Sequence, residues 1–241
     1  MIVLAYVNVI NVHTKTINVN NENDLINILN NDSKDILIIN IDNVKIEIMN
    51  NIYIEDSNYK KISINGKDIK SSILNFNDDN FGLIFSNTYN NTSINEINFN
   101  NLSINGNLEF RNFNYNITIN NVTLNGNIDF NSKTTEKSTI ILNNFQYYSG
   151  STLRNHCINL CGNIKIDNSS FYGSDLCKRS IIYYHGNSVN TVEINNSYFD
   201  GAYSNNCISI IDSLQANIYL TTFEKCASYN EEGGYILFLK F

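Results

Sequence analysis

The sequence predicts an all-β protein: a right-handed parallel β-helix, wound as a three-sheet solenoid, with a short N-terminal capping helix. Three observations support this fold class. One short phrase recurs along the chain, it recurs at a solenoid-like period, and its polar residues alternate with β-branched and aromatic ones. Because each solenoid repeat buries its apolar face only against its neighbours, 241 residues can form one elongated domain.

The recurring phrase is an apolar residue, a pair that is usually Asn-Asn, and a second strand that often ends at Gly. The clearest copies are Phe99–Gly106 and Ile119–Gly126. Every interval between successive starts falls at the short end of the roughly 20–50-residue periods that are typical of solenoids. The copies start at Phe99, Ile119, Leu142, Ile166, Ile194 and Leu220.

A third strand is expected in each interval, after the second strand of the phrase. Leu108–Phe110 and Ile128–Phe130 are equivalent, and their separation equals that between the starts of the first two copies. Cys157–Leu160, Ser180–Tyr183 and Cys207–Ile210 also align, at spacings that follow the repeat intervals. Three strands per interval predict a three-sheet coil with equivalent strands stacked about 4.8 Å apart.

The Asn pairs are predicted to form the bends between two sheets. Asn makes up about a fifth of the chain, far above its usual share. It tolerates the left-handed backbone conformation that a bend requires, and its side-chain amide can bond the Asn one coil away. We therefore interpret the pairs as a structural ladder, with a sugar-binding ladder as the less favoured alternative.

The N-terminal part reads as a helix followed by short strands. Glu22–Leu29 is an amphipathic helix, with Asn23 or Asp24 as its N-cap. Turns are expected at Asn65–Gly66 and Asn77–Asn80. The predicted strands are Ile36–Ile41, Lys45–Met49, Ile52–Ile54, Ile62–Ile64, Ile73–Phe76 and Leu83–Phe85.

The two ends leave alternatives open. Residues 1–16 are either a truncated secretory signal, which the apolar run Met1–Val12 slightly favours, or a first strand. Residues 17–241 form a single β-helix domain. The apolar run Tyr235–Phe241 has nothing after it to cover the last coil, so we expect the array to continue beyond it or to self-associate.

The charged residues of the chain bear on whether it binds nucleic acid. The net charge is −7 and the chain has only three arginines, which argues against nucleic-acid binding.

Five cysteines favour two disulfides, guessed as Cys157 with Cys177 and Cys207 with Cys226, while Cys161 competes for either. Together with the glycosylation acceptors, they favour an extracellular protein. Those acceptors are Asn31, Asn90, Asn91, Asn101, Asn116, Asn121, Asn168 and Asn195.

From about Ile17 onward the chain resembles the right-handed parallel β-helix superfamily of pectate lyases and polygalacturonases. The resemblance rests on the N-terminal helix, the Asn bends, and the progression Ile62-Ser-Ile-Asn-Gly66, Ile73-Leu-Asn-Phe76 and Gly82-Leu-Ile-Phe85. The later segments Phe199-Asp-Gly201, Phe223-Glu-Lys-Cys-Ala227 and Gly233-Gly-Tyr235 are similar to repetitive surface proteins, namely adhesins and cellulosome scaffoldin-type chains. These motifs imply a fold and not an activity.

Lyases of this superfamily use carboxylates that bind Ca²⁺ and a basic residue that abstracts a proton. Here Asp78 and Asp79 lie in a polar turn, and Arg111, Arg154 and Arg179 flank strands. No arginine is expected beside clustered carboxylates in neighbouring coils. We therefore interpret these charges as solvated turn residues.

The other candidate sites are weaker. His185 in Tyr184-His-Gly186 only partly matches a hydrolase motif, and Glu231–Glu232 lies in a loop without the spacing of an acid pair. Zinc ligation by His156, Cys157, Cys161 and Cys177 lacks a close Cys pair, so disulfides are favoured. We therefore predict no catalytic, metal or cofactor-binding residues.

Two functions remain in view. The first is a non-catalytic extracellular module, serving as stalk, adhesin or scaffold, that contacts cell-wall polysaccharide or other surface proteins and has no membrane span. The second is a polysaccharide lyase or glycoside hydrolase acting on pectin-like polymers. A convergence of Asp, Glu and Arg on one groove would favour the enzyme, and scattered charges would favour the module.

Overall fold

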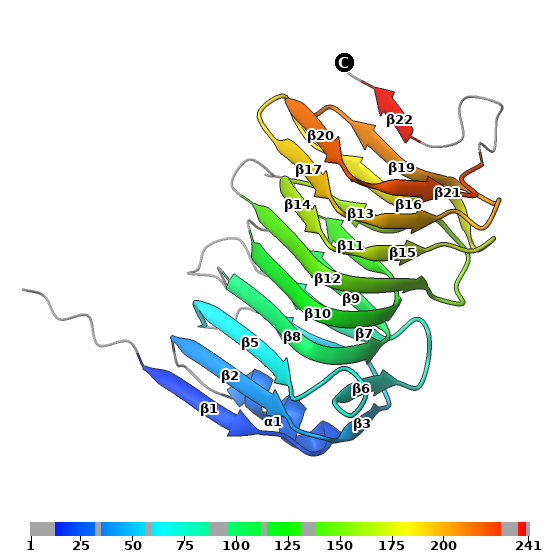
Figure 1. Cartoon of the computed structure of the whole chain (residues 1–241). Coiled ribbons are helices and arrows are strands. Elements are labelled where there is room, and N and C mark those ends of the chain that lie inside the picture. The colour runs from blue at the N-terminus through cyan, green and yellow to red at the C-terminus, as the bar shows by residue number, and fades with distance from the viewer. Residues whose placement is uncertain are drawn as a thin grey trace, which may run out of the picture.

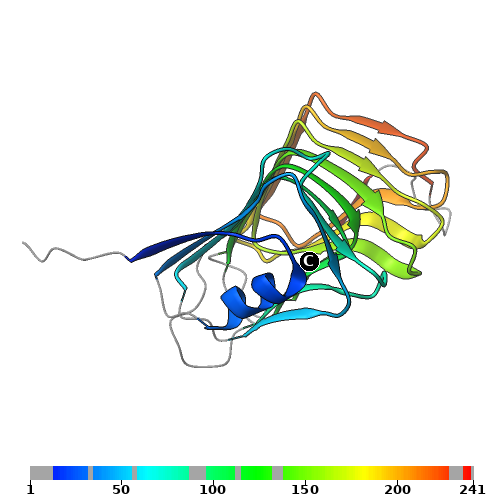
Figure 2. The same cartoon turned by 90° about the horizontal axis from the view of Figure 1, so that it is seen from below.

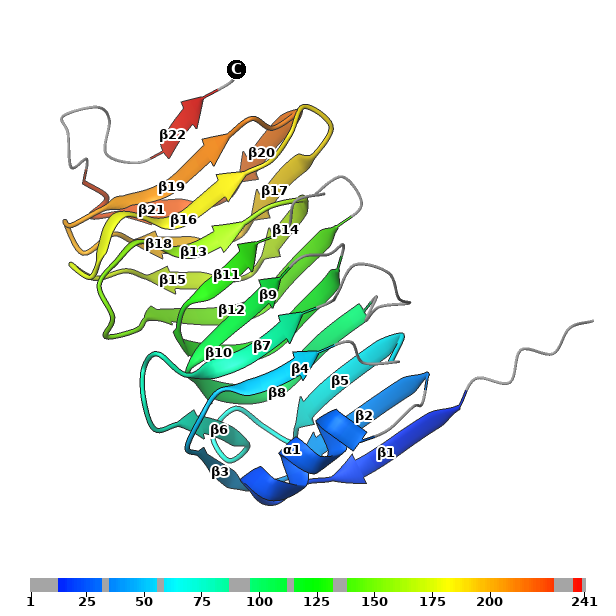
Figure 3. The same ribbon diagram turned by 180° about the vertical axis from the view of Figure 1, so that it is seen from behind.

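The protein is a parallel β-helix, as the sequence predicts (Figures 1 and 3). The structure is a computed structural model that describes residues 13–31, 35–55, 59–86, 96–111, 115–131, 138–227 and 236–239. Throughout these residues the neighbouring strands pair in parallel, and each pairs with the equivalent strand one coil away. The coils therefore stack along one axis, from blue to red in Figure 1.

Each coil contributes a strand to three faces. The first face contains β1 (Thr14–Asn18), β2 (Ile36–Ile41), β5 (Lys61–Gly66), β8 (Glu96–Asn105), β10 (Asn116–Gly126), β12 (Thr139–Ser149), β14 (Asn163–Asp167), β17 (Thr191–Asn195) and β20 (Gln215–Tyr219). The second contains β3 (Lys45–Ile48), β6 (Ile73–Phe76), the second halves of β8, β10 and β12, and β15 (Ser170–Tyr172), β18 (Tyr198–Asp200) and β21 (Thr222–Glu224). The third contains β4 (Ile52–Glu55), β7 (Gly82–Ser86), β9 (Asn107–Arg111), β11 (Ile128–Asn131), β13 (Arg154–Leu160), β16 (Cys177–His185), β19 (Asn206–Ile211) and β22 (Ile236–Leu239).

The Asn pairs form the corner between the first and second faces, as predicted. The second Asn of each pair has a positive φ, for example 56° at Asn101 and 52° at Asn121. The amide of Asn121 donates to Oδ1 of Asn101 at 2.8 Å, so the corner is bonded along the axis. Since β8, β10 and β12 run through this corner unbroken, the first two faces form one bent sheet.

Two predicted alignments are wrong. The sixth copy of the phrase starts at Ile218 and not at Leu220, because Ile194 pairs with Ile218. Leu220 itself takes the corner position, with a φ of 48°. On the third face, Ser180 pairs with His156 and not with Cys157, because a β-bulge between Arg154 and His156 shifts the register.

The core is a set of rows in which similar side chains repeat from coil to coil. Phe171 stacks on Phe199 with 4.5 Å between ring centroids, and Phe199 stacks on Phe223 at 5.0 Å. The alternation of strand side chains also settles where the tyrosines lie. Tyr147 and Tyr184 are buried in the core, while Tyr148 is exposed and Tyr183 and Tyr198 are half-buried on the outside.

The N-terminal end is closed by α1 (Glu22–Asn31), which lies across the first coil (Figure 2). Leu25 and Leu29 are buried beneath it. The helix is longer than predicted, and its N-cap is Asn21 rather than Asn23 or Asp24. Oδ1 of Asn21 accepts a hydrogen bond from the backbone N of Asp24 at 2.9 Å. The apolar run Met1–Val12 lies outside the described residues.

Both guessed disulfides are present, Cys157–Cys177 and Cys207–Cys226. Cys161 belongs to neither; its buried thiol donates to the carbonyl oxygen of Phe130 at 3.6 Å. No helix in the described part of the chain has the length and apolarity needed to cross a bilayer.

Candidate functional site

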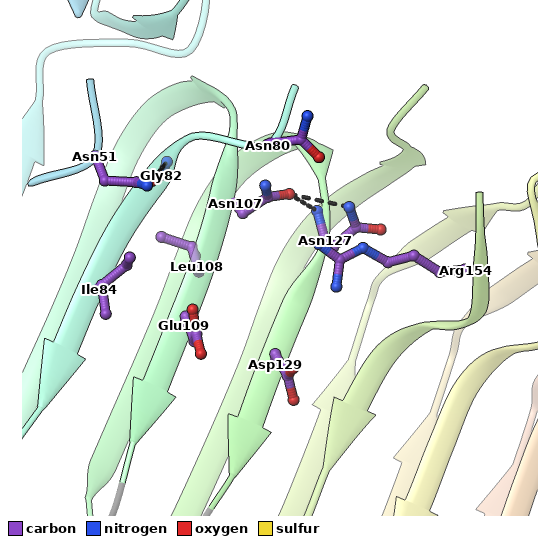
Figure 4. Close-up of a pocket in the computed structure, with 10 residues that line it drawn as sticks. All are labelled: Asn51, Asn80, Gly82, Ile84, Asn107, Leu108, Glu109, Asn127, Asp129 and Arg154. Atoms are coloured by element: carbon purple, nitrogen blue, oxygen red, sulfur yellow. Dashed lines mark hydrogen bonds between the residues drawn. The ribbon is translucent and has the colours of Figure 1, made fainter. Parts of the chain in front are cut away.

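A hollow opens on the third face, over the first half of β7, β9 and β11 and the start of β13 (Figure 4). Its empty volume is about 330 Å³. Consecutive coils contribute equivalent positions to its wall, so similar polar groups recur along it. The hollow is lined by Asn51, Asn80, Gly82, Ile84, Asn107, Leu108, Glu109, Asn127, Asp129 and Arg154.

A second row of Asn side chains forms one edge of the hollow. Oδ1 of Asn51 accepts a hydrogen bond from the backbone N of Gly82 at 2.9 Å. Oδ1 of Asn107 accepts both from the backbone N of Asn127 at 3.0 Å and from its Nδ2 at 2.9 Å. The row ends at Asn127, which is 2% exposed and whose own Oδ1 has no hydrogen-bond partner.

In the next coil the register aligns Cys157 with Asn127, and Arg154 lies three residues before Cys157, at the start of β13. The β-bulge at the start of β13 separates Arg154 from His156 in the register, and the Arg154 side chain extends toward Asn127 (Figure 4). Its Nε is buried and has no hydrogen-bond partner. A buried polar atom without a partner costs about 1–3 kcal/mol, so the hollow holds both an unused acceptor and an unused donor.

Two carboxylates stand side by side on the floor of the hollow. Glu109 and Asp129 are register partners on β9 and β11, and Asn159 follows on β13. Glu109 accepts from Nε and Nη2 of Arg111 at 2.6 and 2.8 Å, and this hydrogen bonding raises the pKa of Arg111. Burial, reinforced by the charge of Glu109, raises the pKa of Asp129 against the opposing effects of Arg154 and a hydrogen bond from Asn159.

Two loops distant in sequence meet beside the hollow. The hydroxyl of Ser151 donates to Oδ2 of Asp79, and that of Thr152 donates to Oδ1 of Asn80 at 3.5 Å, across 72 residues of sequence. The loop that follows β12 therefore reaches back along the axis to the turn that precedes β7. Because Asn80 lines the hollow, this contact lies at its edge.

An aromatic pair continues the outer surface beyond Asn159. Tyr183 is the register partner of Asn159, and its ring stacks on that of His156 at 4.2 Å. Nδ1 of His156 lies 2.6 Å from Oγ of Ser180. Burial, helped by the charge of Arg179, lowers the pKa of His156 to about 4, so the ring is neutral at physiological pH.

Of the candidate site residues that the sequence suggested, the structure places only some near the hollow. Asp78 and Asp79 lie in an exposed turn, and Arg179 and His185 are exposed on β16. Arg111 pairs with Glu109 of its own strand, and the charge of Arg154 acts on Asp129 of the neighbouring coil, a proximity that the sequence did not lead us to expect. Glu231 and Glu232 lie outside the described residues. Within the described ranges, no cluster of three or more His, Cys, Asp and Glu side chains is placed to hold a metal ion.

Sequence reasoning missed Glu109, Asp129 and Asn127. The signal was present, because Leu108-Glu-Phe110 and Ile128-Asp-Phe130 align as equivalent third strands. The central residue of each must point outward when its neighbours point inward, so two carboxylates on adjacent coils follow from the alignment. Asn127 is the residue that immediately precedes the second of these strands.

No protein family, curated protein or solved structure matches this chain. The fold itself places the chain in the class of parallel β-helix proteins. The candidate functional site on this fold is the polar hollow of the third face.

Proposed function

We propose that this chain is a non-catalytic extracellular β-helix module that attaches to cell-wall polysaccharide through the hollow of the third face. One observation carries the proposal: Oδ1 of Asn127 and Nε of Arg154 are both buried in the hollow without a hydrogen-bond partner. Polysaccharides present many hydroxyl groups, and these can satisfy both atoms. The long rigid stack of coils suits a stalk or scaffold that carries such a site.

The extracellular assignment is supported by the two disulfides, which persist in oxidising compartments. The glycosylation acceptors in the sequence support the same location. Both observations also suit a chain that works outside the cell as part of a larger assembly.

A polysaccharide screen tests the proposal. The purified chain is incubated with insoluble cellulose, xylan, mannan and pectin, with and without Ca²⁺. Both the bound fraction and the released reducing-end or unsaturated products are measured. We expect binding to at least one polymer without product release, and failure to bind any of them would overturn the proposal.

A specific observation favours a glycoside hydrolase as the second candidate. Glu109 and Asp129 lie on adjacent rungs about 4.8 Å apart. The carboxyl groups of retaining glycosidases are about 5–5.5 Å apart. The raised pKa of Asp129 would suit the acid, with Glu109 as the second carboxyl group of the pair. Against this, both oxygens of Glu109 are already bonded to Arg111, which leaves it a poor nucleophile.

Two variants separate these candidates. Glu109→Gln and Asp129→Asn keep the shapes of the side chains and remove their acid–base chemistry. If product release is found in the screen and both variants abolish it, the chain is a hydrolase. The binding module requires that wild type and both variants release no product.

A further inference from the structure

The unused groups of the hollow define the chemistry of a ligand. Oδ1 of Asn127 requires a donor, and Nε of Arg154 requires an acceptor. Figure 4 places these two side chains at one end of the hollow, with Glu109 and Asp129 at the other. A ligand that fits must therefore both donate and accept at one end and meet carboxyl groups at the other.

A hydroxyl group is both donor and acceptor, so one hydroxyl can bond Asn127 and Arg154 together. A neighbouring hydroxyl can then donate to Asp129 or Glu109. A single water molecule could also bond Asn127 and Arg154 together. Of the empty volume of about 330 Å³, which includes open solvent, about 50 Å³ admits the centres of water-sized molecules, more than one water needs, and the recurring polar groups favour a molecule with several hydroxyls in a row.

The charges around the hollow distinguish between neutral and acidic sugars. The wall carries two carboxyl groups, Glu109 and Asp129, and one guanidinium, that of Arg154. Arg111 is already bonded to Glu109 through two nitrogens. The charge of Arg154 acts on the neighbouring Asp129. Each cation is therefore matched by a carboxyl group, and the hollow has no surplus positive charge to hold a uronate carboxylate.

We infer that the hollow recognises a neutral sugar residue of a polysaccharide through neighbouring hydroxyls, with Asn127, Arg154 and Asp129 as the groups that contact it. This inference rests on the proposed function of the same hollow and names its ligand class. It separates this site from sites for pectin-like acidic polymers. Binding that depends on hydroxyl hydrogen bonds rather than on charge should change little with salt.

Calorimetric titration with four hexasaccharides tests the inference. Cellohexaose, xylohexaose and mannohexaose are the neutral probes, and hexagalacturonate is the acidic probe, each at 50 and 500 mM NaCl. We expect at least one neutral probe to bind more tightly than hexagalacturonate, with a Kd that salt does not change. Chemical-shift changes should centre on the amides of Asn127, Asp129 and Arg154.

Two variants of the hollow are tested, so that a folding defect in one of them is not mistaken for a loss of binding. Asn127→Leu keeps the size of the side chain and removes the acceptor Oδ1, but it also removes the amide that bonds Asn107 and can disturb the row. Arg154→Met, which keeps length and loses every donor, is therefore the second test. Each is expected to weaken neutral-sugar binding about tenfold, the loss typical of one hydrogen bond. Asn125→Leu is the matched control, because Asn125 donates to Asn105 at 2.7 Å on the second face, away from the hollow.

The outcomes are distinct. Tighter, salt-sensitive binding of hexagalacturonate overturns the inference while the proposed polysaccharide attachment stands. Neutral-sugar binding that Arg154→Met and Asn127→Leu leave unchanged also overturns it, because the ligand then binds elsewhere. If no hexasaccharide and no insoluble polymer binds, the proposed function fails together with the inference.

Discussion

At the residue scale, one position per coil decides how the chain turns from the first face to the second. Asn holds this position in five successive coils, at 101, 121, 144, 168 and 196, always with a positive φ. In the following coil the position belongs to Leu220, which has a φ of 48° and is 85% exposed. The left-handed conformation costs most L-residues about 1–2 kcal/mol, and Leu lacks the polar side chain that lowers the cost for Asn.

Leu220→Asn should therefore stabilise the coil that contains β20 and β21 by about 1 kcal/mol. Hydrogen exchange of the amides of these two strands measures the gain, in protein from a host that does not glycosylate. Thr221→Asn is the matched control, because it adds the same side chain one residue beyond the corner. Equal protection in the two variants would show that the backbone of Leu220 is not the cause.

The ionisation of Asp129 in the candidate site affects the stability of the folded chain. Burial and the charge of Glu109 disfavour its ionised form, so its folded pKa lies above the ordinary 3.8. Below pH 3.8 the folded and unfolded chains both carry the proton, and the shift has no effect. As the pH rises toward the folded pKa, the unfolded chain loses the proton first, so the folded state is progressively penalised and stays so above that pKa.

Asp129→Asn should therefore raise the midpoint of thermal unfolding at pH 7, and the advantage should shrink as the pH is lowered toward 3.8. Thermal unfolding from pH 3 to 8 checks this, with Asp175→Asn in an exposed turn as the control. A constant difference across the pH range would mean that the substitution acts through packing and not through ionisation.

At the scale of the element, each short strand is held by rows of stacked side chains and not by its own length. β18 has only three residues, yet its Phe199 is fully buried between Phe171 and Phe223. Its neighbour Tyr198 points outward, and its hydroxyl donates to Oε2 of Glu224 at 3.0 Å. One strand thus carries a core residue and a surface residue side by side.

Phe199→Ala should cost about 3–5 kcal/mol, because it removes a ring from the middle of a continuous stack. Tyr198→Ala, one residue away and half-buried on the outside, should cost only about 1 kcal/mol, the net worth of a typical hydrogen bond. Urea unfolding of both variants gives the comparison. Similar losses would contradict the assignment of inward and outward positions on β18.

The local features of the coil follow from the sequence, and the hollow does not. The Asn pairs give the corners because αL backbone and amide bonding are properties of that residue. The bulge at Arg154 arises in the pairing of β13 with β16, and the contact of Ser151 with Asp79 joins segments 72 residues apart; no local pattern encodes either of them. The same bulge makes the predicted alignment of Ser180 wrong. The start of the sixth copy was predicted at Leu220 because Leu-Thr-Thr resembles Leu-Asn-Asn in sequence.

At the scale of the whole molecule, the two halves of the axis are held together differently. Asn-to-Asn amide bonds between coils run from Asn18–Asn40 to Asn120–Asn143 in the part of the chain that the structure describes. Beyond β12 the covalent links take over, with Cys157–Cys177 joining β13 to β16 and Cys207–Cys226 joining β19 to the segment after β21. Because solenoid coils contact only their neighbours, each half can lose structure without the other.

Replacing all four bonded cysteines by alanine should therefore open the C-terminal coils first. Each disulfide closes a short loop, with sequence separations of 20 and 19 residues, and such loops stabilise by about 3 kcal/mol in the chain-entropy estimate. Hydrogen exchange read by mass spectrometry should show lost protection from β13 to β19 while β2 to β10 stay protected. Cys161→Ala, a buried cysteine outside both disulfides, is the control and should leave the difference between the halves unchanged. An equal loss of protection in every coil would instead mean that the solenoid unfolds as one cooperative unit, and that the disulfides stabilise all of it alike.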